Sequence, residues 1–204
     1  SPNLPILYSF RRCPYAMRAR MALLYTSINV ELREVVLRDK PPSMLAVSAK
    51  GTVPVVQSGQ QVLDESLAIQ RWALDRRDPH GWLAGWSGAE VAEMEALIAE
   101  NDGPFKHHLD RFKYPNRYPG EPSEPHRRAG LAILRDWERR LAPGGWLLGS
   151  RPSLADWSLL PFVRQFAHID QTWFASEPWP AVQSWLAAFK ASDRFTRIMQ
   201  KYPP

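Results

Sequence analysis

Short apolar runs and helical repeats follow one another along the first 77 residues. The runs at 5–10, 30–37 and 53–57 are rich in β-branched or aromatic side chains and predict strands. A glycine-containing turn at 58–60 leads into a further short run at 61–64, which predicts a hairpin. Residues 14–25 and 65–77 repeat apolar side chains at helical spacing, and 41–49 predicts a short helical connection. The order β-α-β-(α)-β-β-α predicts a small α/β sandwich.

The remainder of the chain shows only helical patterns. Residues 78–88 are rich in Gly, Pro and Trp and are expected to form a linker. Helices are predicted over 89–112, 126–141, 153–169 and 180–192, and Gly103-Pro104 is expected to kink or end the first of them. Ser153 and Asp156 have the spacing of a capping box before a strongly apolar helix, the expected core of this part. We therefore predict an α/β domain (1–77), a linker (78–88) and an all-helical domain (89–204).

Composition excludes several function classes. The chain of 204 residues is 45% hydrophobic, which favours a packed core over disorder. No apolar run approaches the ~18 residues of a membrane span, no signal peptide is visible, and a single cysteine implies no oxidising compartment. A cytoplasmic protein that does not span a membrane is the expectation.

The net charge is distributed unevenly. Residues 1–77 hold 11 Lys+Arg and 6 Asp+Glu, so they carry the whole net charge of +5. This distribution indicates an anionic partner for the first part of the chain, although solvated surface arginines are the plainer explanation. No helix-turn-helix, zinc-finger or RNA-binding signature is present, so no nucleic-acid partner is predicted.

The only cysteine, Cys13, lies between a predicted strand and a predicted helix that begins with Pro14. The first turn of a helix presents unpaired N–H groups and the positive end of the macrodipole, and both favour a thiolate. Helix N-termini with nearby cations lower a thiol pKa from about 8.5 to between about 3.5 and 7.5. The nearby cations are Arg11, Arg12, Arg18 and Arg20, and each can lower the thiol pKa only if it points toward the sulfur. Not all of them can, because Arg18 and Arg20 lie on helix faces about 160° apart.

Ala16 stands where a dithiol redox protein has its second cysteine. Any disulfide at Cys13 must then be a mixed one, resolved by an external thiol. Three alternatives remain open: a buried cysteine that only fills space, a Cys–His hydrolase with His107 or His108 as base, and a zinc site. With one cysteine and five scattered histidines, no metal site is predicted.

Four segments in order resemble the glutathione transferases over essentially the whole chain. "YSFRRCPYAMRARMAL" resembles the first strand and active-site helix of cysteine-type members, including the omega class; "KGTVPVV" resembles the segment in which the proline is cis. "LDESLAIQRW" resembles the glutathione-binding turn and its helix, and "PSLADWSLLPF" resembles the capping-box helix of the helical domain. The resemblance implies a thioredoxin-like N-terminal domain followed by a helical bundle.

The resemblance also implies how glutathione, as co-substrate, is bound. A cis bond at Val53-Pro54 turns the Val53 backbone outward to pair with a peptide; a trans proline on an edge strand is the alternative. Glu65 and Ser66 suit the γ-glutamyl end, although an ordinary helix cap explains them too. Lys40 suits the glycine carboxylate, with plain solvent exposure as its alternative. Further contact positions are Tyr15, Leu37 and Thr52.

The second-substrate site implied by the family lies between the domains, along the helix after the linker. Candidates there are Phe10, Phe105, His108, Arg111 and Phe112. A solvated, kinked helix end is the alternative for the histidine pair.

We therefore expect a glutathione-dependent thiol transferase, catalysed by Cys13, acting by deglutathionylation, thiol-disulfide exchange or dehydroascorbate reduction. Its partners are glutathione and a small-molecule or protein disulfide or electrophile, and a homodimer is implied by the family. Two alternatives are a transferase, isomerase or dehalogenase in a catabolic pathway, and a non-catalytic binding module.

Overall fold

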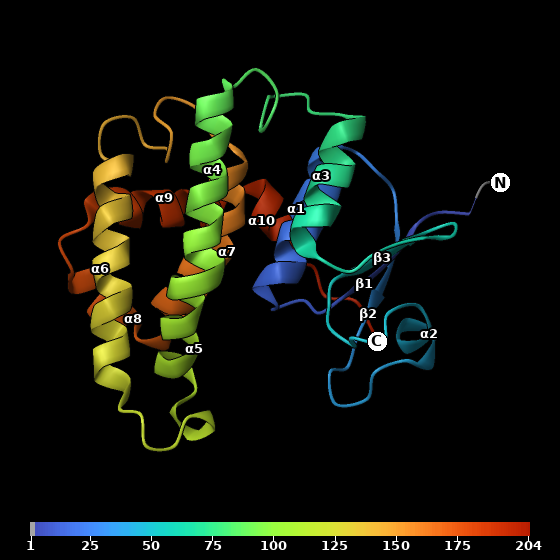
Figure 1. The fold of residues 1–204 in the computed structure, drawn as a ribbon, viewed down its shortest axis with the longest axis horizontal. Coiled ribbons are helices and arrows are strands. Elements are labelled where there is room, and N and C mark those ends of the chain that lie inside the picture. The colour runs from blue at the N-terminus through green and yellow to red at the C-terminus, as the bar shows by residue number, and fades with distance from the viewer. Residues whose placement is uncertain (1–2) are drawn as a thin grey trace. The chain divides into compact units, whose positions relative to one another are not determined.

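A computed structural model describes residues 3–204, which divide into two compact units (Figure 1). The first unit extends to His80 and also includes Ala191–Pro204; the second comprises Gly81–Lys190. The sequence analysis had placed residues 191–204 with the helical domain, whereas in the structure they pack with the α/β unit. Among residues 3–204, no helix is both long and apolar enough to cross a membrane.

The first unit contains a four-stranded sheet in the order β2-β1-β3-β4. Its strands are β1 (Ile6–Ser9), β2 (Glu31–Glu34), β3 (Val55–Ser58) and β4 (Gln61–Leu63). β1 pairs in parallel with β2 and antiparallel with β3, and β3 forms the hairpin with β4. The parallel pair requires a crossover, which is made by helix α1 (Pro14–Tyr25).

Helices cover both faces of this sheet. α1 and α3 (Ser66–Arg76) lie side by side on one face (Figure 1), where Leu7 and Val56 join the core cluster of both helices. Tyr8 follows Leu7 in β1, and Val55 precedes Val56 in β3. Both side chains point to the opposite face and pack with Met44 of α2 (Pro42–Val47). This alternation follows from the two-residue period of a strand. The predicted βαβ-ββα arrangement is confirmed.

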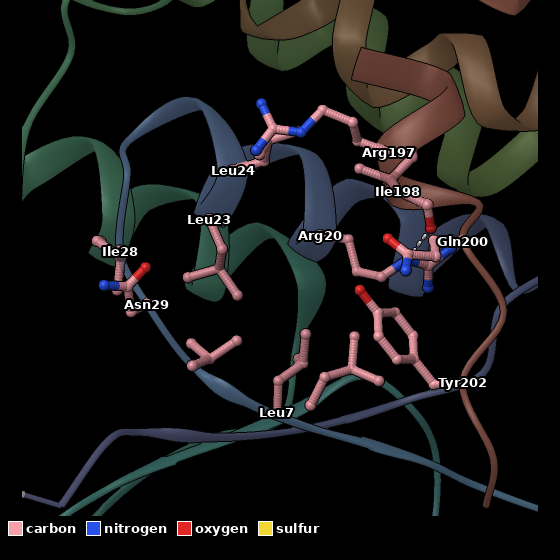
Figure 2. Close-up of a pocket in the computed structure, with 12 residues that line it drawn as sticks. Leu7, Arg20, Leu23, Leu24, Ile28, Asn29, Arg197, Ile198, Gln200 and Tyr202 are labelled. Carbon is pink, nitrogen blue, oxygen red and sulfur yellow. Dashed lines mark hydrogen bonds between the residues drawn. The ribbon is translucent and has the colours of Figure 1, made fainter. Parts of the chain in front are cut away.

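The C-terminal segment completes the first unit. Helix α10 (Asp193–Ile198) lies against α1, and the Ile198 carbonyl accepts a hydrogen bond of 2.9 Å from Arg20 Nε, dashed in Figure 2. A cavity of about 310 Å³ lies beside this contact, between α1, the β1–β2 edge and Tyr202 (Figure 2). Cys13 is not among the residues that line this cavity.

The second unit consists of helices joined by loops. Its helices are α4 (Gly88–Glu100), α5 (Lys106–Lys113), α6 (Ser123–Leu141), α7 (Leu154–Ile169), α8 (Gln171–Ser176) and α9 (Pro180–Ala191), the last of which ends in the first residue of the C-terminal segment. A single 3₁₀ turn, η2, covers Pro115–Arg117. α7 is buried along most of its length and begins with a complete Ser153–Asp156 capping box, so both predictions about this helix are confirmed.

The predicted interruption at Gly103-Pro104 takes an unexpected form. The chain stays helical and passes through a π-helical segment, η1 (Asn101–Phe105), before α5. Proline has no N–H to donate, and an inserted π-turn accommodates it without ending the helix. The sequence analysis also left α8 and α10 unassigned. Each has six residues and begins at a polar cap, Asp170 for α8 and Ser192 for α10.

Candidate active site

Cys13 is the N-cap residue of α1. Its backbone is extended, with φ −71° and ψ 122°, and Pro14 takes the first helical position. The Cys13 N–H donates to the Phe10 carbonyl at 3.1 Å, and its carbonyl accepts the first helical hydrogen bond, from Met17 at 2.9 Å. The side chain does not cap the helix and is half-buried. The sulfur is therefore held at the positive end of a helix of 12 residues.

The segment before β3 lies against this sulfur. Cys13 Sγ is 4.0 Å from the carbonyl oxygen of Val53. The peptide bond between Val53 and Pro54 is cis, so that prediction is confirmed. Thr52 is exposed, and Lys40 extends over Gly51, where an added Cβ would lie 3.5 Å from Lys40 Nζ. Thus the structure brings three of the predicted glutathione-site segments close to one another.

Arg20 fixes the loop that carries Cys13. Only 7% of the Arg20 side chain is exposed, and its guanidinium donates to Ser9 Oγ at 2.6 Å, to the Phe10 carbonyl at 3.2 Å and to the Arg11 carbonyl. Burial lowers the pKa of Arg20 to about 10, while charge interactions with Glu34 and with Cys13 act in the opposite direction. Arg20 is thus a buried cation coupled electrostatically to Cys13.

Arg18 points to a different part of the unit. Its side chain is fully buried, and its Nη1 donates to Ser66 Oγ at 3.3 Å. The guanidinium carbon also lies 5.5 Å from the centre of the Tyr15 ring. The predicted separation of Arg18 and Arg20 on the helix is confirmed, and Arg18 links α1 to the start of α3. Sequence periodicity alone did not reveal that both arginines are buried.

The remaining arginines of this stretch lie nearer the surface. The Arg11 N–H donates to Glu34 Oε1 at 2.8 Å, and the exposed Arg12 places its guanidinium 5.9 Å from the centre of the Phe10 ring.

Ser66 and Glu65 begin α3 as predicted. Ser66 is 5% exposed, whereas Glu65 is the N-cap residue and points its side chain into solvent without capping the helix. The Glu65 carboxylate pairs with Lys50 Nζ. Lys50 also donates to the backbone carbonyl of Asp64 at 3.0 Å. The sequence analysis did not identify Lys50, because two residues separated by 15 positions share no local pattern.

The other hydroxyls near the start of α1 are engaged elsewhere. Tyr8 Oη accepts a hydrogen bond of 3.1 Å from Arg33, and Ser9 Oγ accepts the bond from Arg20. Tyr8 is 1% exposed and Ser9 is fully buried. Both hydroxyls are therefore buried and already bonded to arginines. Leu37, by contrast, is 45% exposed on a surface turn.

Phe105 requires a correction. Its ring is fully buried in the helical unit, with its centre 4.9 Å from that of Trp137 and 5.3 Å from that of Phe166. A side chain without exposed surface cannot touch a substrate, so Phe105 is a core residue. Phe112 is half-buried and packs against Phe166 and Trp173.

The polar candidates of α5 form a network within the helical unit. Arg111 Nε donates to Glu121 Oε2 at 3.0 Å, and its guanidinium lies 4.2 Å from the centre of the Tyr118 ring. His108 lies beside His107 and His126, and burial, followed by the charges of these neighbours and Arg111, lowers the pKa of His108. The sequence analysis described the histidines as scattered; the structure brings three of them together.

Comparison with known proteins gives the family of both units. Residues 7–81 match the sequence model described as "Glutathione S-transferase, N-terminal domain", and residues 95–188 match the corresponding C-terminal domain. Glutathione S-transferase 3 of Zea mays is 25% identical, over 97% of this chain and 94% of that protein. A maleylacetoacetate isomerase of Rhizobium meliloti is 26% identical, over 79% and 81% respectively. An elongation factor 1-gamma from rice is 22% identical over 93% of this chain, which spans half the length of that relative.

Solved structures share the fold at low identity. Glutathione transferase Omega 3C from Trametes versicolor has a TM-score of 0.82 at 21% identity, covering 100% of this chain and 92% of that one. A family member from Pseudomonas fluorescens, solved with two glutathione bound, has a TM-score of 0.81 at 21% identity, covering 97% and 93%. Together with the two domain matches, which cover most of the chain, these findings place the protein in the glutathione S-transferase family.

Proposed function

We propose that this protein is a glutathione-dependent thiol transferase whose nucleophile is Cys13. The observation that carries the proposal is the position of Cys13 as N-cap of α1, with its sulfur beside the Val53 carbonyl and the buried cation of Arg20 electrostatically coupled to it. Both the helix end and the cation favour the thiolate, which is the reactive form. Ala16 leaves no second thiol one turn along the helix.

Glutathione binds along the Val53 backbone as an added strand in this proposal. The Ser66 hydroxyl and the first N–H groups of α3 donate hydrogen bonds to its γ-glutamyl carboxylate, while Glu65 pairs with its ammonium group. Lys40, which lies over Gly51, pairs with the glycine carboxylate. Tyr15, Leu37 and Thr52 line the same path. The family name and the glutathione-bound relative from Pseudomonas fluorescens support glutathione as the co-substrate.

The reaction consists of two exchanges of sulfur partners. The Cys13 thiolate attacks the glutathionyl sulfur of a mixed disulfide, the S–S bond breaks, and the other thiol leaves as a thiolate with its electron pair. A second glutathione thiolate then attacks the Cys13–glutathione disulfide, which releases glutathione disulfide and restores the Cys13 thiolate. Conjugation to chlorinated aromatics is expected to be weak, because the Cys13 thiolate takes the glutathionyl group from an existing disulfide and has no hydroxyl hydrogen with which to activate a bound glutathione thiol.

For the second substrate, the family resemblance implies contacts with Phe10, His108, Arg111 and Phe112. The substrate is a disulfide or other electrophile on a small molecule or a protein. We also propose a cytoplasmic homodimer, by analogy with the family; the dimer is tested by light scattering of the purified protein.

A second candidate is glutathione-dependent isomerisation, which is favoured by the similarity to the Rhizobium meliloti isomerase. In that reaction glutathione is regenerated and no disulfide forms at Cys13. The two candidates therefore differ in whether turnover leaves glutathione oxidised.

The deciding experiment is treatment of the intact protein with glutathione disulfide followed by mass spectrometry. Wild type is expected to gain one glutathionyl group at Cys13, and added glutathione should remove it. Cys13→Ser should gain none and should lose thiol transfer from a glutathione mixed disulfide. Tyr8→Phe is the matched control, because its hydroxyl is already held by Arg33. Thiol transfer that survives Cys13→Ser undiminished contradicts the proposal.

A further inference from the structure

Three of the five histidines gather where α5 meets α6. His107 and His108 are on α5, and His126 is on α6. Their ring centres are 5.0, 5.7 and 5.2 Å apart, and one ring nitrogen from each lies within 4.8 Å of those of the other two. His107 is exposed, while His108 and His126 are half-buried. The cluster is therefore open to solvent on one side and supported by the protein on the other.

Two of these side chains already direct ring nitrogens at each other. The Nδ1 atoms of His108 and His126 are 2.9 Å apart. Metal–nitrogen distances of about 2.0–2.1 Å place two ligand nitrogens about 3.0–3.4 Å apart around a single ion. A shift of a few tenths of an ångström would therefore suit both nitrogens to one metal. His107, whose ring is exposed, needs only a side-chain rotation to add a third.

Glu121 holds His126 in the tautomer that a metal requires. Its Oε2 lies 3.2 Å from His126 Nε2 and accepts the hydrogen of that nitrogen, so the lone pair of Nδ1 faces His108. Arg111 Nε donates to the same carboxylate oxygen at 3.0 Å and fixes its position. In metal sites, a carboxylate commonly accepts a hydrogen bond from the ring nitrogen of a ligating histidine that does not bind the metal.

We propose that His107, His108 and His126 form a binding site for a divalent transition-metal ion, with Zn²⁺ as the principal candidate and water completing the coordination. Neutral imidazole suits Zn²⁺, Ni²⁺ and Cu²⁺, whereas Mg²⁺ and Ca²⁺ prefer oxygen ligands that the cluster does not supply. The proposal does not depend on Cys13 or on glutathione.

The bound ion would join α5 to the first turn of α6 across the loop of residues 114–122. That loop is rich in proline and includes the 3₁₀ turn η2 (Pro115–Arg117). Without a metal, the two Nδ1 atoms can share one hydrogen, which makes a neutral hydrogen bond between His108 and His126 instead. The metal and the hydrogen bond therefore compete for the same two nitrogens, and a titration distinguishes them.

The test is calorimetric titration of tag-free protein with ZnCl₂, repeated with CoCl₂ while the visible absorption of bound Co²⁺ is recorded. Wild type is expected to bind one equivalent. His126→Ala and His108→Ala should weaken binding by more than about 100-fold, and Glu121→Gln by about 10- to 100-fold, the range for a lost carboxylate partner of a ligating histidine. The thermal midpoint of the wild type should rise with ZnCl₂ concentration, because a ligand of the folded state stabilises it.

Two controls make the result specific. His168→Asn removes an exposed histidine that contacts Lys190 and should leave zinc binding unchanged. Cys13→Ser should also bind zinc like the wild type, which separates this site from a thiolate site. Failure of the wild type to bind ZnCl₂, or equal binding by the wild type and both histidine variants, would overturn the proposal. Circular dichroism of each variant checks that it is folded.

Discussion

Asp156 is the buried acid whose protonation should be visible in the stability of the protein. Its side chain is fully buried at the start of α7. Oδ1 accepts hydrogen bonds from Leu147 N–H at 3.0 Å and Trp185 Nε1 at 3.2 Å, and Oδ2 accepts from Ser153 N–H at 2.9 Å. Burial raises the pKa of Asp156 from 3.8 to about 6, although the hydrogen bonds act in the opposite direction.

The sign of the effect follows from where the proton binds more tightly. Because the folded pKa is raised, the folded state holds the Asp156 proton more strongly than the unfolded chain does. Its contribution to stability is fully present below pH 3.8 and is lost as pH rises through about 6. The pKa of Asp156 in the folded state lies about 2 units above its value in the unfolded chain, and at 1.36 kcal/mol per unit this difference corresponds to about 3 kcal/mol. Between pH 4 and pH 7 most of this contribution, about 2–3 kcal/mol, should disappear.

The perturbation is Asp156→Asn, which keeps the shape of the side chain but cannot ionise. Urea unfolding of wild type and variant, followed by tryptophan fluorescence, gives the free energy of unfolding of each between pH 4 and pH 7. We expect the cost of the substitution to be about 2–3 kcal/mol greater at pH 4 than at pH 7. Taking the difference between the two proteins removes the contributions of the other titrating groups, which both proteins share.

The second capping box of the chain supplies a matched control. Ser87 and Glu90 make the same reciprocal hydrogen bonds at the start of α4, but on the surface. Hydrogen bonds from Ser87 lower the pKa of Glu90, so its contribution is lost as pH falls. Glu90→Gln should therefore show a pH dependence of opposite sign to that of Asp156→Asn. A cost of Asp156→Asn that is constant from pH 4 to pH 7, or greater at pH 7, would refute the reasoning.

Two further predictions concern packing and the loop that carries Cys13. Gly130→Ala should destabilise the protein by about 1–3 kcal/mol, because its Cβ would lie 2.7 Å from the buried Phe166 ring. Gly103→Ala, where nothing lies within 4 Å, should cost much less in the same urea assay. Arg20→Lys should lower the rate of thiol transfer by Cys13 more than it lowers glutathione binding, because an ammonium group cannot make all the bonds to the loop; steady-state kinetics separate the two effects.

Local sequence patterns were sufficient to predict where most of the helices and strands lie. Pro14 after the only cysteine predicted both the start of α1 and the position of Cys13 at its N-terminus, because a proline is favoured at the first helical position. Ser153 and Asp156 predicted the beginning of α7 for a similar reason: a capping box is complete within four residues. The family resemblance added the cis bond before Pro54, which no local pattern specifies.

The short helices and the form of the interruption at Pro104 were harder to predict from the sequence. α8 and α10 have six residues each, too few to show a helical period, and only their caps mark them. Pro104 correctly marked a disturbance, but a proline in a helical pattern does not specify whether the helix ends, kinks or passes through a π-helical segment, as it does here.

The sequence by itself therefore determined what is encoded between neighbours: the strands and the longer helices, the capping box of α7, the monothiol pattern at Cys13, and the family to which these motifs belong. The tertiary structure alone decided which distant side chains meet. It buried Arg18 and Arg20 in different directions, took Phe105 out of reach of any substrate, and brought His126 to within 2.9 Å of His108 across 18 positions. Such contacts depend on how helices pack, and packing is set by the shape of many side chains together rather than by the spacing of any few.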